Sequence, residues 1–468
     1  MAHVRTVQPP STNGPEPVAA GRGAAAEIPA PAPDRRAARQ LAITVVADVR
    51  RPRLAGLKRT LQALGADPAT NAMVPFAALP RTHFARLLVL DPDATADGAP
   101  IEPHLVYMAD VDEPADAEPA LERCLEELVD VAGEGLDRIF GACVGYPPPS
   151  RATRALRLAF LHAHAVSAAA AYVNTIGRSV RQILQEEQLR IAIREFLDRR
   201  GAELGDREPD EVRTAIRQFV RGRAELAWAL TPPPSPSLAD RAKDAGHLLA
   251  LPAGLLALSP VIVPALPLYA LALRRQEKRD PDPHISPTRD HVLALAESED
   301  HAPQNQFSAV GFLKAGRLRR LTAEVVTRGI DYAARHVYGH ANLAGVKTIH
   351  CARWVWLDDH RRLIFASNYD GSLESYNDDF VDKVWWGLNA VFSNGVGWPR
   401  TRWLFFDGAR QEQAFKDWLR RNQVPTQVWY SAYPQLTALN VENNARIRSG
   451  LHQEAMSAKE ATRWLRRI

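Results

Sequence analysis

Hydrophobic residues follow the same succession of spacings in two stretches of the chain. In the first stretch a strand-like run, "LAITVVADVR" at 41–50, precedes leucines at helical spacing that stop at Gly65. This stretch predicts a helix with Leu54, Leu57, Leu61 and Leu64, strands at 82–91 and 104–111, and a helix with Leu121, Cys124, Leu125 and Leu128. The second predicts a strand at 307–314, a helix at 317–338, strands at 348–358 and 362–369, a helix with Phe380, Val384, Leu388 and Val391, and a strand at 425–434.

Short strings repeat at corresponding places in the two stretches. "THFARLLVLDP" at 82–92 and "IHCARWVWLDD" at 349–359 carry His, Ala, Arg and Asp at the same offsets. "GLDRIFGACVGYP" from Gly135 likewise matches "GLNAVFSNGVGWP" from Gly387. Because these matches occur in the same order, they predict an internal duplication. The predicted fold class is α+β, with one ferredoxin-like βαββαβ repeat at 41–200 and another at 306–450.

Both faces of the strand "IHCARWVWL" are apolar, which indicates a sheet that is covered on both sides. The two sheets are therefore expected to face each other as a pseudo-dimer. In this order of elements the chain resembles the dimeric α+β barrel superfamily, which includes dye-decolorizing peroxidase-like and chlorite dismutase-like haem proteins. The resemblance implies an interior pocket for haem or for a small apolar ligand.

A helical linker at 201–305 separates the repeats and holds the least polar part of the chain. Residues 248–273 contain no charged side chain, so they are long enough for a membrane segment. Four prolines within this run favour a broken or re-entrant hairpin over a straight helix. Basic residues on both flanks predict that it enters the bilayer and returns to the cytosolic side. The alternative is a Pro-rich helical pair buried against this protein or a partner.

Composition limits the remaining choices. Residues 1–40, rich in Pro, Ala and Gly, predict a disordered leader, and residues 451–468 predict a C-terminal helix. A net charge of +4 without a basic aromatic stripe argues against nucleic-acid binding. Three scattered cysteines form neither a disulfide framework nor a metal motif, so no metal site is expected. The predicted location is cytoplasmic and membrane-associated, with lipid as the expected partner.

The repeated string contains the candidate site. A tight hairpin centred near His360 places His350 opposite Asp370 and Ala352 opposite Asn368, and the same count places His83 near Asp112. A carboxylate beside an imidazole can prepare a general base or a ligand for metal or haem. The same pair can equally satisfy polar groups at strand ends.

Arg353 and Arg86 are expected on the face opposite to the histidines. From there Arg353 could bind a carboxylate or a haem propionate, or it could form an ion pair within the protein. Nine of the ten tryptophans lie at or after Trp354, which is compatible with core packing, with a pocket for a flat ligand, or with a membrane-interface belt.

Two functions are compatible with these patterns. In the first, a membrane-associated protein binds haem or a small apolar ligand between its repeats and supports peroxidase-like oxidoreductase chemistry. Its candidate catalytic residues are His350, Asp370, Arg353 and Asn368. The alternative is a non-catalytic, membrane-anchored scaffold or adaptor. No motif in the sequence fixes a reaction, a substrate or an oligomeric state.

Overall fold

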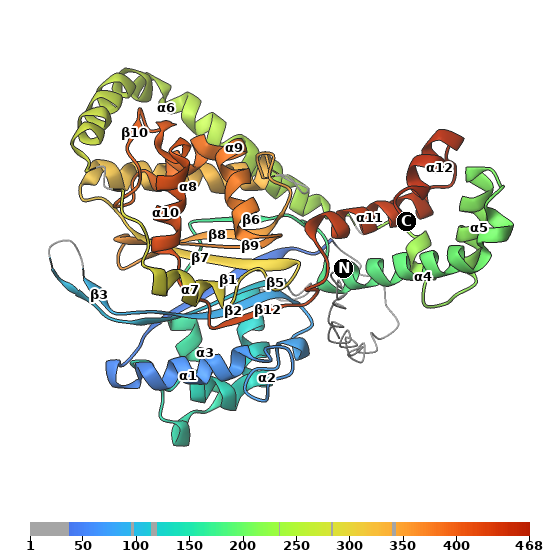
Figure 1. Cartoon of the computed structure of the whole chain (residues 1–468), viewed down its shortest axis with the longest axis horizontal. Helices are drawn as coiled ribbons and strands as arrows, with labels where there is room; N and C mark the ends of the chain where they lie inside the picture. The colour runs from blue at the N-terminus through green and yellow to red at the C-terminus, as the bar shows by residue number, and fades with distance from the viewer. Residues whose placement is uncertain (1–36, 95–97, 114–118, 234, 282–283, 339–342) are drawn as a thin grey trace, which may run out of the picture. The chain divides into compact units, whose positions relative to one another are not determined.

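The computed structural model describes residues 37–94, 98–113, 119–233, 235–281, 284–338 and 343–468. The predicted leader at 1–40 therefore lies almost entirely outside the described residues. Every contact reported below belongs to the unit Asp34–Ile468. This unit mixes helices with two four-stranded antiparallel sheets and contains one long apolar helix (Figure 1).

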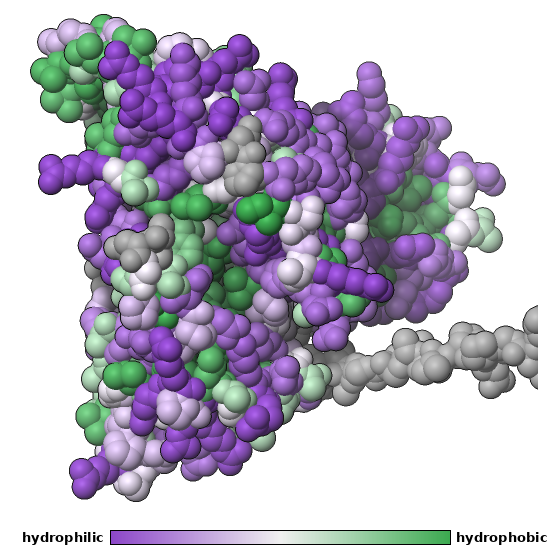
Figure 2. Space-filling model, turned by 60° about the vertical axis from the view of Figure 1, so that its left-hand side comes forward, coloured by the Kyte–Doolittle hydropathy of each residue, from purple (hydrophilic) through white to green (hydrophobic). Residues whose placement is uncertain are grey.

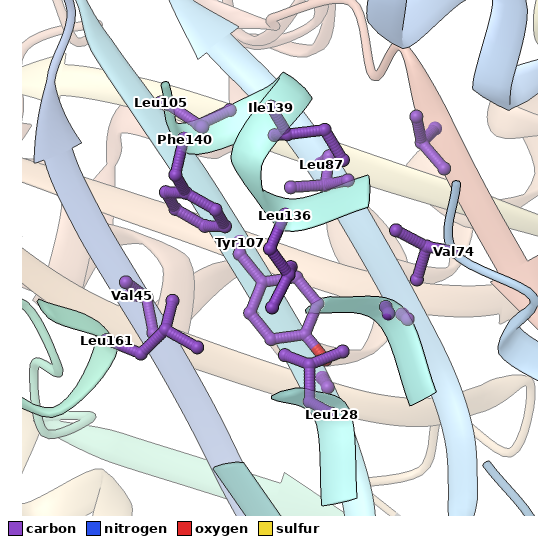
Figure 3. Close-up of a cluster of buried hydrophobic side chains, with 14 of the residues drawn as sticks. Val45, Val74, Leu87, Leu105, Tyr107, Leu128, Leu136, Ile139, Phe140 and Leu161 are labelled. Atoms are coloured by element: carbon purple, nitrogen blue, oxygen red, sulfur yellow. The ribbon is translucent and has the colours of Figure 1, made fainter. Parts of the chain in front are cut away.

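The first sheet is covered on one face by helices. Its strands, in spatial order, are β1 (Gln40–Asp48), β5 (His104–Asp112), β2 (Thr82–Leu90) and β12 (Val428–Ser431). Its helices are α1 (Leu54–Gly65), α2 (Ala120–Phe140) and α3 (Arg154–Ala163). Leu136 and Phe140 of α2 pack on Tyr107 and Leu105 of β5 in the core between them (Figure 3). The leucine spacing that predicted α1 is confirmed, because Leu57, Leu61 and Leu64 are buried in this core.

The second sheet has the same arrangement. Its strands, in spatial order, are β6 (Ala170–Val173), β8 (Ile349–Leu357), β9 (Arg362–Asp370) and β7 (Gln304–Phe312). Its helices are α8 (Arg317–His336), α9 (Leu373–Phe392) and α10 (Glu412–Asn422). They lie on the side of this sheet that faces away from the first sheet (Figure 1). The core between them is rich in aromatic side chains, including Trp354, Phe365, Tyr376, Trp398 and Trp418.

Each sheet receives one strand from the other half of the chain. The strand expected to end the second stretch, β12, pairs with β2 of the first sheet, where Trp429 lies opposite Arg86. Reciprocally, β6 pairs with β8 of the second sheet, where Ala171 lies opposite Arg353. This exchange differs from two self-contained repeats. Its physical effect is to cover an edge strand of each sheet with a strand that the other half supplies.

The two sheets pack face to face through an apolar layer. That layer consists of buried residues from both sheets, namely Leu88, Leu90, Val106, Met108, Val355, Leu357, Ile364 and Ala366. The central strands β2, β5, β8 and β9 thus have protein on both faces, which explains why β2, β5 and β9 are buried along their full length and β8 at every position but Trp356.

A separate group of helices forms a third hydrophobic cluster. It contains α4 (Val180–Leu204), α5 (Pro209–Arg221), α11 (Ala438–His452) and α12 (Ala458–Leu465). The helix α12 covers part of the stretch 451–468, over which a C-terminal helix was expected. Two short two-stranded hairpins lie outside the four-stranded sheets: β3 (Asp93–Ala94) pairs with β4 (Pro100–Ile101), and β10 (Thr401–Arg402) pairs with β11 (Phe406–Asp407). A short helix, α7 (Arg289–Ala296), precedes β7.

The apolar run of the linker lies in one continuous helix, α6 (Leu238–Arg279). It begins with a capping box between Ser237 and Asp240, and it contains Pro252, Pro260, Pro264 and Pro267. The expected break into two helices is therefore wrong. The prolines bend the helix instead, as Figure 1 shows, because each removes one backbone donor and pushes the preceding turn away.

Candidate functional site

A β-bulge changes the register of the hairpin that carries the candidate site. Ala352 pairs with Ser367 and Cys351 with Asn368, so the expected pairing of Ala352 with Asn368 is wrong by one residue. The irregularity lies between Ile349 and Cys351, at His350. The first sheet has the same irregularity between Thr82 and Phe84, at His83. A bulge inserts one residue and turns the side chain, which is why simple counting failed here.

His350 and Asp370 nevertheless meet. The His350 Nε2 atom lies 2.7 Å from Asp370 Oδ1, and both residues are buried. The other oxygen of Asp370 accepts a hydrogen bond of 2.7 Å from the backbone N–H of Ala438 at the start of α11. His350 Nδ1 is buried without a hydrogen-bond partner. The carboxylate thus joins the end of β9 to a helix N-terminus, where negative charge is stabilised.

The first sheet repeats this joint. His83 Nε2 lies 2.9 Å from Asp112 Oδ1, and the other oxygen of Asp112 accepts a hydrogen bond of 2.8 Å from the N–H of Val180 at the start of α4. His83 differs in one respect, because its Nδ1 atom lies 2.9 Å from the Tyr433 hydroxyl. Residues that are far apart in the chain thus meet at two places, where β12 pairs with β2 and where Asp112 binds the start of α4.

Arg353 reaches from the second sheet to the first. Its guanidinium donates to the carbonyl oxygens of Ile43 at 2.6 Å and Ala109 at 2.9 Å, and it forms an ion pair with Asp110. The side chain is buried. Of the two expectations for Arg353, the structure shows the ion pair within the protein.

Arg86 makes the reciprocal contacts from the first sheet to the second. It donates to the carbonyl oxygens of Phe307 and Ser367, both at 2.8 Å, and to Asn368 Oδ1 at 2.5 Å. Asn368 therefore binds Arg86, and it also accepts from Trp429 Nε1 at 3.0 Å. Each arginine thus crosses the apolar layer and ties one sheet to the backbone of the other.

The two arginines differ in their counter-charge. Arg353 pairs with Asp110, whereas the equivalent partner of Arg86 is the neutral Asn368. In the described part of the chain no carboxylate is hydrogen-bonded to Arg86. Burial, with the charge of Arg353 as a second cause, lowers the pKa of Arg86 to about 10, and Asp110 opposes that change. The interior therefore holds a guanidinium that backbone and amide oxygens solvate in place of a carboxylate.

The space between the sheets does not fit haem. His350 was expected on the face opposite to Arg353, but its ring centroid lies 5.4 Å from that of Phe84 in the first sheet, and Arg353 reaches the first sheet as well. Aliphatic side chains and the two arginines fill the layer between the sheets. His350 Nε2 is already bound to Asp370. A macrocycle would have to displace these contacts.

Other features of the described residues offer little for chemistry. No group of three or more His, Cys, Asp or Glu side chains among them is arranged to hold a metal ion. A depression of about 190 Å³ lies between α11 and α12, lined by Arg446, Gln453, Arg463 and Trp464 among others. All three cysteines are buried and free. Burial raises the pKa of the Cys124 thiol to about 11 and that of Cys143 to about 12, so neither is prepared as a nucleophile.

The most unusual surface belongs to α6. Among the described residues it is the one helix long and apolar enough to cross a membrane, and no residue of its most apolar part is buried. The exposed aliphatic side chains are Leu248, Leu249, Leu251, Leu255, Leu256, Leu258, Val261, Val263, Leu266, Leu268 and Leu271. Figure 2 shows hydrophobic residues gathered at its upper left, at the level of α6 in Figure 1. Contiguous exposed apolar patches larger than a few hundred Å² are rare on monomeric soluble proteins.

Both ends of this apolar run are tied to the same helix. The Tyr332 hydroxyl donates to the carbonyl of Leu248 at 2.8 Å, and the Tyr269 hydroxyl lies 2.7 Å from Thr322 Oγ1. Along α8, Thr322 and Tyr332 are about 15 Å apart, whereas a straight helix from Leu248 to Tyr269 would be about 31 Å long. The helix must therefore bow outward between its two attachments, as its bend in Figure 1 shows. We call residues 249–268 the arch.

Comparison with known proteins gives no further guide to the site: no protein family, no curated protein and no solved structure matches the chain.

Proposed function

We propose that the chain is a monotopic membrane protein whose arch enters one leaflet and whose two-sheet body serves as a non-catalytic scaffold at that surface. The observation that carries this proposal is the arch, an uncharged helical segment that has no buried residue and is attached to the body at both ends. Because its two ends return to α8, the arch enters and leaves on the same side of the membrane.

Solvation energy supports lipid as the environment of the arch. Leu256, Val261 and Leu268 are 76%, 71% and 73% exposed. Full burial of one such side chain is worth about 1.5–3 kcal/mol, so transferring these three into hydrocarbon would stabilise the bound state by about 4 kcal/mol. Prolines are tolerated in such a helix, because Ser or Thr side chains, ordered waters and local adjustments of the helix can satisfy the carbonyls that they leave unpaired.

Charge on the flanks of the arch supports the orientation. Arg241 and Lys243 precede the arch, and Arg275, Lys278 and Arg279 follow it, and all five are exposed. Basic residues on both sides of a hydrophobic segment favour the cytosolic surface with its anionic lipids. We therefore place the body in the cytoplasm.

The scaffold role rests on how the candidate catalytic residues are used. His350 and Asp370 bind each other and the start of α11, while Arg353 and Asn368 bind groups of the first sheet. These bonds hold strands and helices together, so the same side chains are not available to a substrate. The haem-binding alternative lacks space, and no observation favours a small apolar ligand between the sheets.

We also infer that the body is a duplicated βαββαβ unit related to the dimeric α+β barrels. Support comes from equivalent strand orders in the two sheets and from equivalent positions of the histidine–aspartate joints and crossing arginines. In such a pair of units the exchanged strands would take the place of a dimer contact.

Flotation with vesicles tests the membrane proposal. Purified full-length protein should float with vesicles of phosphatidylcholine and phosphatidylglycerol. Changing Leu256, Val261 and Leu268 together to Gln should lower the bound fraction at least tenfold, because each change removes about 1 kcal/mol or more of transfer free energy. Gln is uncharged, like the residues it replaces, and it favours helix, so the fold is preserved.

The matched control is Leu238→Gln. Leu238 belongs to the same helix and is 82% exposed, but it lies outside the apolar run. This variant should float like the unaltered protein. The proposal is overturned if the unaltered protein stays at the bottom of the gradient, or if the triple variant floats equally well. If the unaltered protein forms a stable oligomer and the triple variant alone loses it, the arch is assigned to a protein contact.

A further inference from the structure

The hairpin of β10 and β11 displays aromatic side chains to solvent. Thr401 pairs with Asp407 and Arg402 with Phe406, which leaves Trp403–Phe405 as the loop. Trp403, Phe405 and Phe406 are 43%, 42% and 47% exposed. Large aromatic side chains usually lie in cores, as Trp398 and Trp418 do in the same half of the chain. Three exposed aromatics within four residues therefore need an explanation.

The backbone of this loop adopts a conformation that its residues disfavour. Trp403 and Leu404 have φ values of 55° and 68°. L-residues with bulky side chains rarely occupy this left-handed region, and strain of this kind gathers at functional sites. Asn or Gly would relieve the strain at either position, so the aromatic residue at 403 is kept at a cost in stability.

Two buried polar side chains hold the loop in this conformation from below. The Glu277 carboxylate accepts hydrogen bonds from the backbone N–H groups of Trp403 at 2.9 Å and Leu404 at 2.7 Å. Asn389 donates to the carbonyl oxygens of Phe405 at 2.8 Å and Asp407 at 2.9 Å. Both side chains are fully buried. These four hydrogen bonds hold the backbone of the loop in place, and with it the aromatic side chains.

Glu277 also fixes where the hairpin lies relative to the arch. It belongs to the last turns of α6, shortly after the end of the uncharged run. Arg274 donates to both Glu277 and the carbonyl of Thr401, at 3.0 and 3.2 Å. The aromatic loop therefore stands beside the end of α6 where the chain leaves the proposed membrane segment.

The charge around the loop complements an anionic surface. Arg275, Lys278 and Arg279 are exposed on the adjoining end of α6, and Arg402 is exposed within the hairpin with its guanidinium 5.8 Å from the Phe406 ring centre. Aromatic side chains with nearby cations are typical of residues that lie at the level of lipid headgroups.

We propose that the hairpin Thr401–Asp407 is a second membrane contact, which inserts Trp403, Phe405 and Phe406 into the headgroup region of an anionic leaflet. This inference rests on the proposed function of the arch and deepens it. An arch alone fixes one line of contact, about which the body can tilt. The hairpin adds a contact beside that line and so sets the orientation of the sheets above the membrane.

The test uses the full-length protein and vesicles of phosphatidylcholine and phosphatidylglycerol. The hairpin variant combines Trp403→Asn, Phe405→Ser and Phe406→Ser. It should bind vesicles about tenfold more weakly. Its thermal unfolding midpoint should stay equal or rise, because Asn tolerates a positive φ. The control is Leu439→Ser, since Leu439 is an exposed leucine on α11, and it should bind like the unaltered protein.

A conservative variant gives a readout that does not depend on how the triple variant folds. Phosphatidylcholine brominated near the headgroup end of its acyl chains should quench part of the tryptophan fluorescence. Trp403→Phe should remove most of that quenching while binding persists.

The outcomes separate the two proposals. The hairpin contact is overturned if the arch variant loses binding while the hairpin variant binds normally and Trp403→Phe leaves the quenching unchanged. If the unaltered protein does not float at all, the membrane proposal itself fails. Normal flotation of the hairpin variant together with loss of a protein complex would assign the hairpin to a protein partner and also overturn the lipid contact.

Discussion

The unequal charges between the two sheets allow a quantitative prediction. Asp110 forms an ion pair with Arg353, one of the two arginines that cross between the sheets. Asp110→Asn keeps the shape of the side chain but leaves Arg353 and Arg86 with neutral oxygen partners only. Removing one partner of a buried pair typically costs about 3–5 kcal/mol, because the remaining charge stays desolvated.

The state of Arg86 gives an independent scale for this cost. Its pKa is lowered to about 10 from 12.5, chiefly by burial, which corresponds to about 3 kcal/mol of lost stabilisation of the charged form. Arg353 in the Asp110→Asn variant would face an environment like that of Arg86. We therefore expect the free energy of unfolding to fall by about 3 kcal/mol.

Urea denaturation followed by circular dichroism measures this change. Asn368→Asp, added to Asp110→Asn, transfers the carboxylate to Arg86 and should restore about half of the loss. Asn368 is the equivalent position in the other sheet and touches Arg86 directly. The reasoning is refuted if Asp110→Asn costs less than about 1 kcal/mol, or if the second change adds to the loss.

Three further predictions concern the histidine–aspartate joints, the packing of β12 on α1, and the buried carboxylate of Asp358. Asp370→Ala should lower the free energy of unfolding by about 2–4 kcal/mol, because it leaves a buried imidazole nitrogen and a helix N–H unpaired. Asp112→Ala should cost a similar amount, as measured by urea titration. A loss below about 1 kcal/mol in both variants would contradict this prediction. Gly65→Ala should destabilise the fold by about 1–3 kcal/mol, because the added carbon would lie 2.0 Å from the carbonyl oxygen of the residue preceding β12. The control Gly56→Ala lies in the same helix, has open space, and should be neutral or slightly stabilising. Equal melting temperatures of the two variants would argue against the exchanged strand. Burial opposes ionisation of Asp358, but hydrogen bonds from His104 and Arg362 outweigh burial and lower the pKa of Asp358 to about 2. The ionised carboxylate therefore contributes about 2 kcal/mol of stability above pH 4, and this contribution is lost as the pH falls through 2. Asp358→Asn should flatten the profile of stability against pH in that window, and an unchanged profile would count against the assignment.

Local patterns predicted much of the secondary structure. The leucines of α1 and the paired strands β8 and β9 were found from periodicity, because burial of one helix face or of a whole strand leaves a record within a few residues. The contact between His350 and Asp370 was also predicted, since a tight hairpin brings its arms together whatever surrounds them. The register around this pair was not, because a bulge has no clear signal in one strand.

Long-range pairing could not be predicted in the same way. The short strand β12 carries nothing that distinguishes the edge of one sheet from the edge of the other, and its choice of β2 depends on packing that involves both halves of the chain. The aromatic hairpin was missed too. The run "RWLFFD" at 402–407 was a signal, but its exposure depends on Glu277, more than a hundred residues earlier.

The sequence by itself determined the elements, the two similar stretches and the uncharged segment with its prolines, because each depends on spacing and composition within a short window. Tertiary structure decided which sheet receives each last strand, that Arg86 and Arg353 cross between the sheets, and that α6 bows away from α8. Those outcomes depend on which surfaces meet in space, where a strand edge, a buried charge or a bent helix finds a partner distant in the chain.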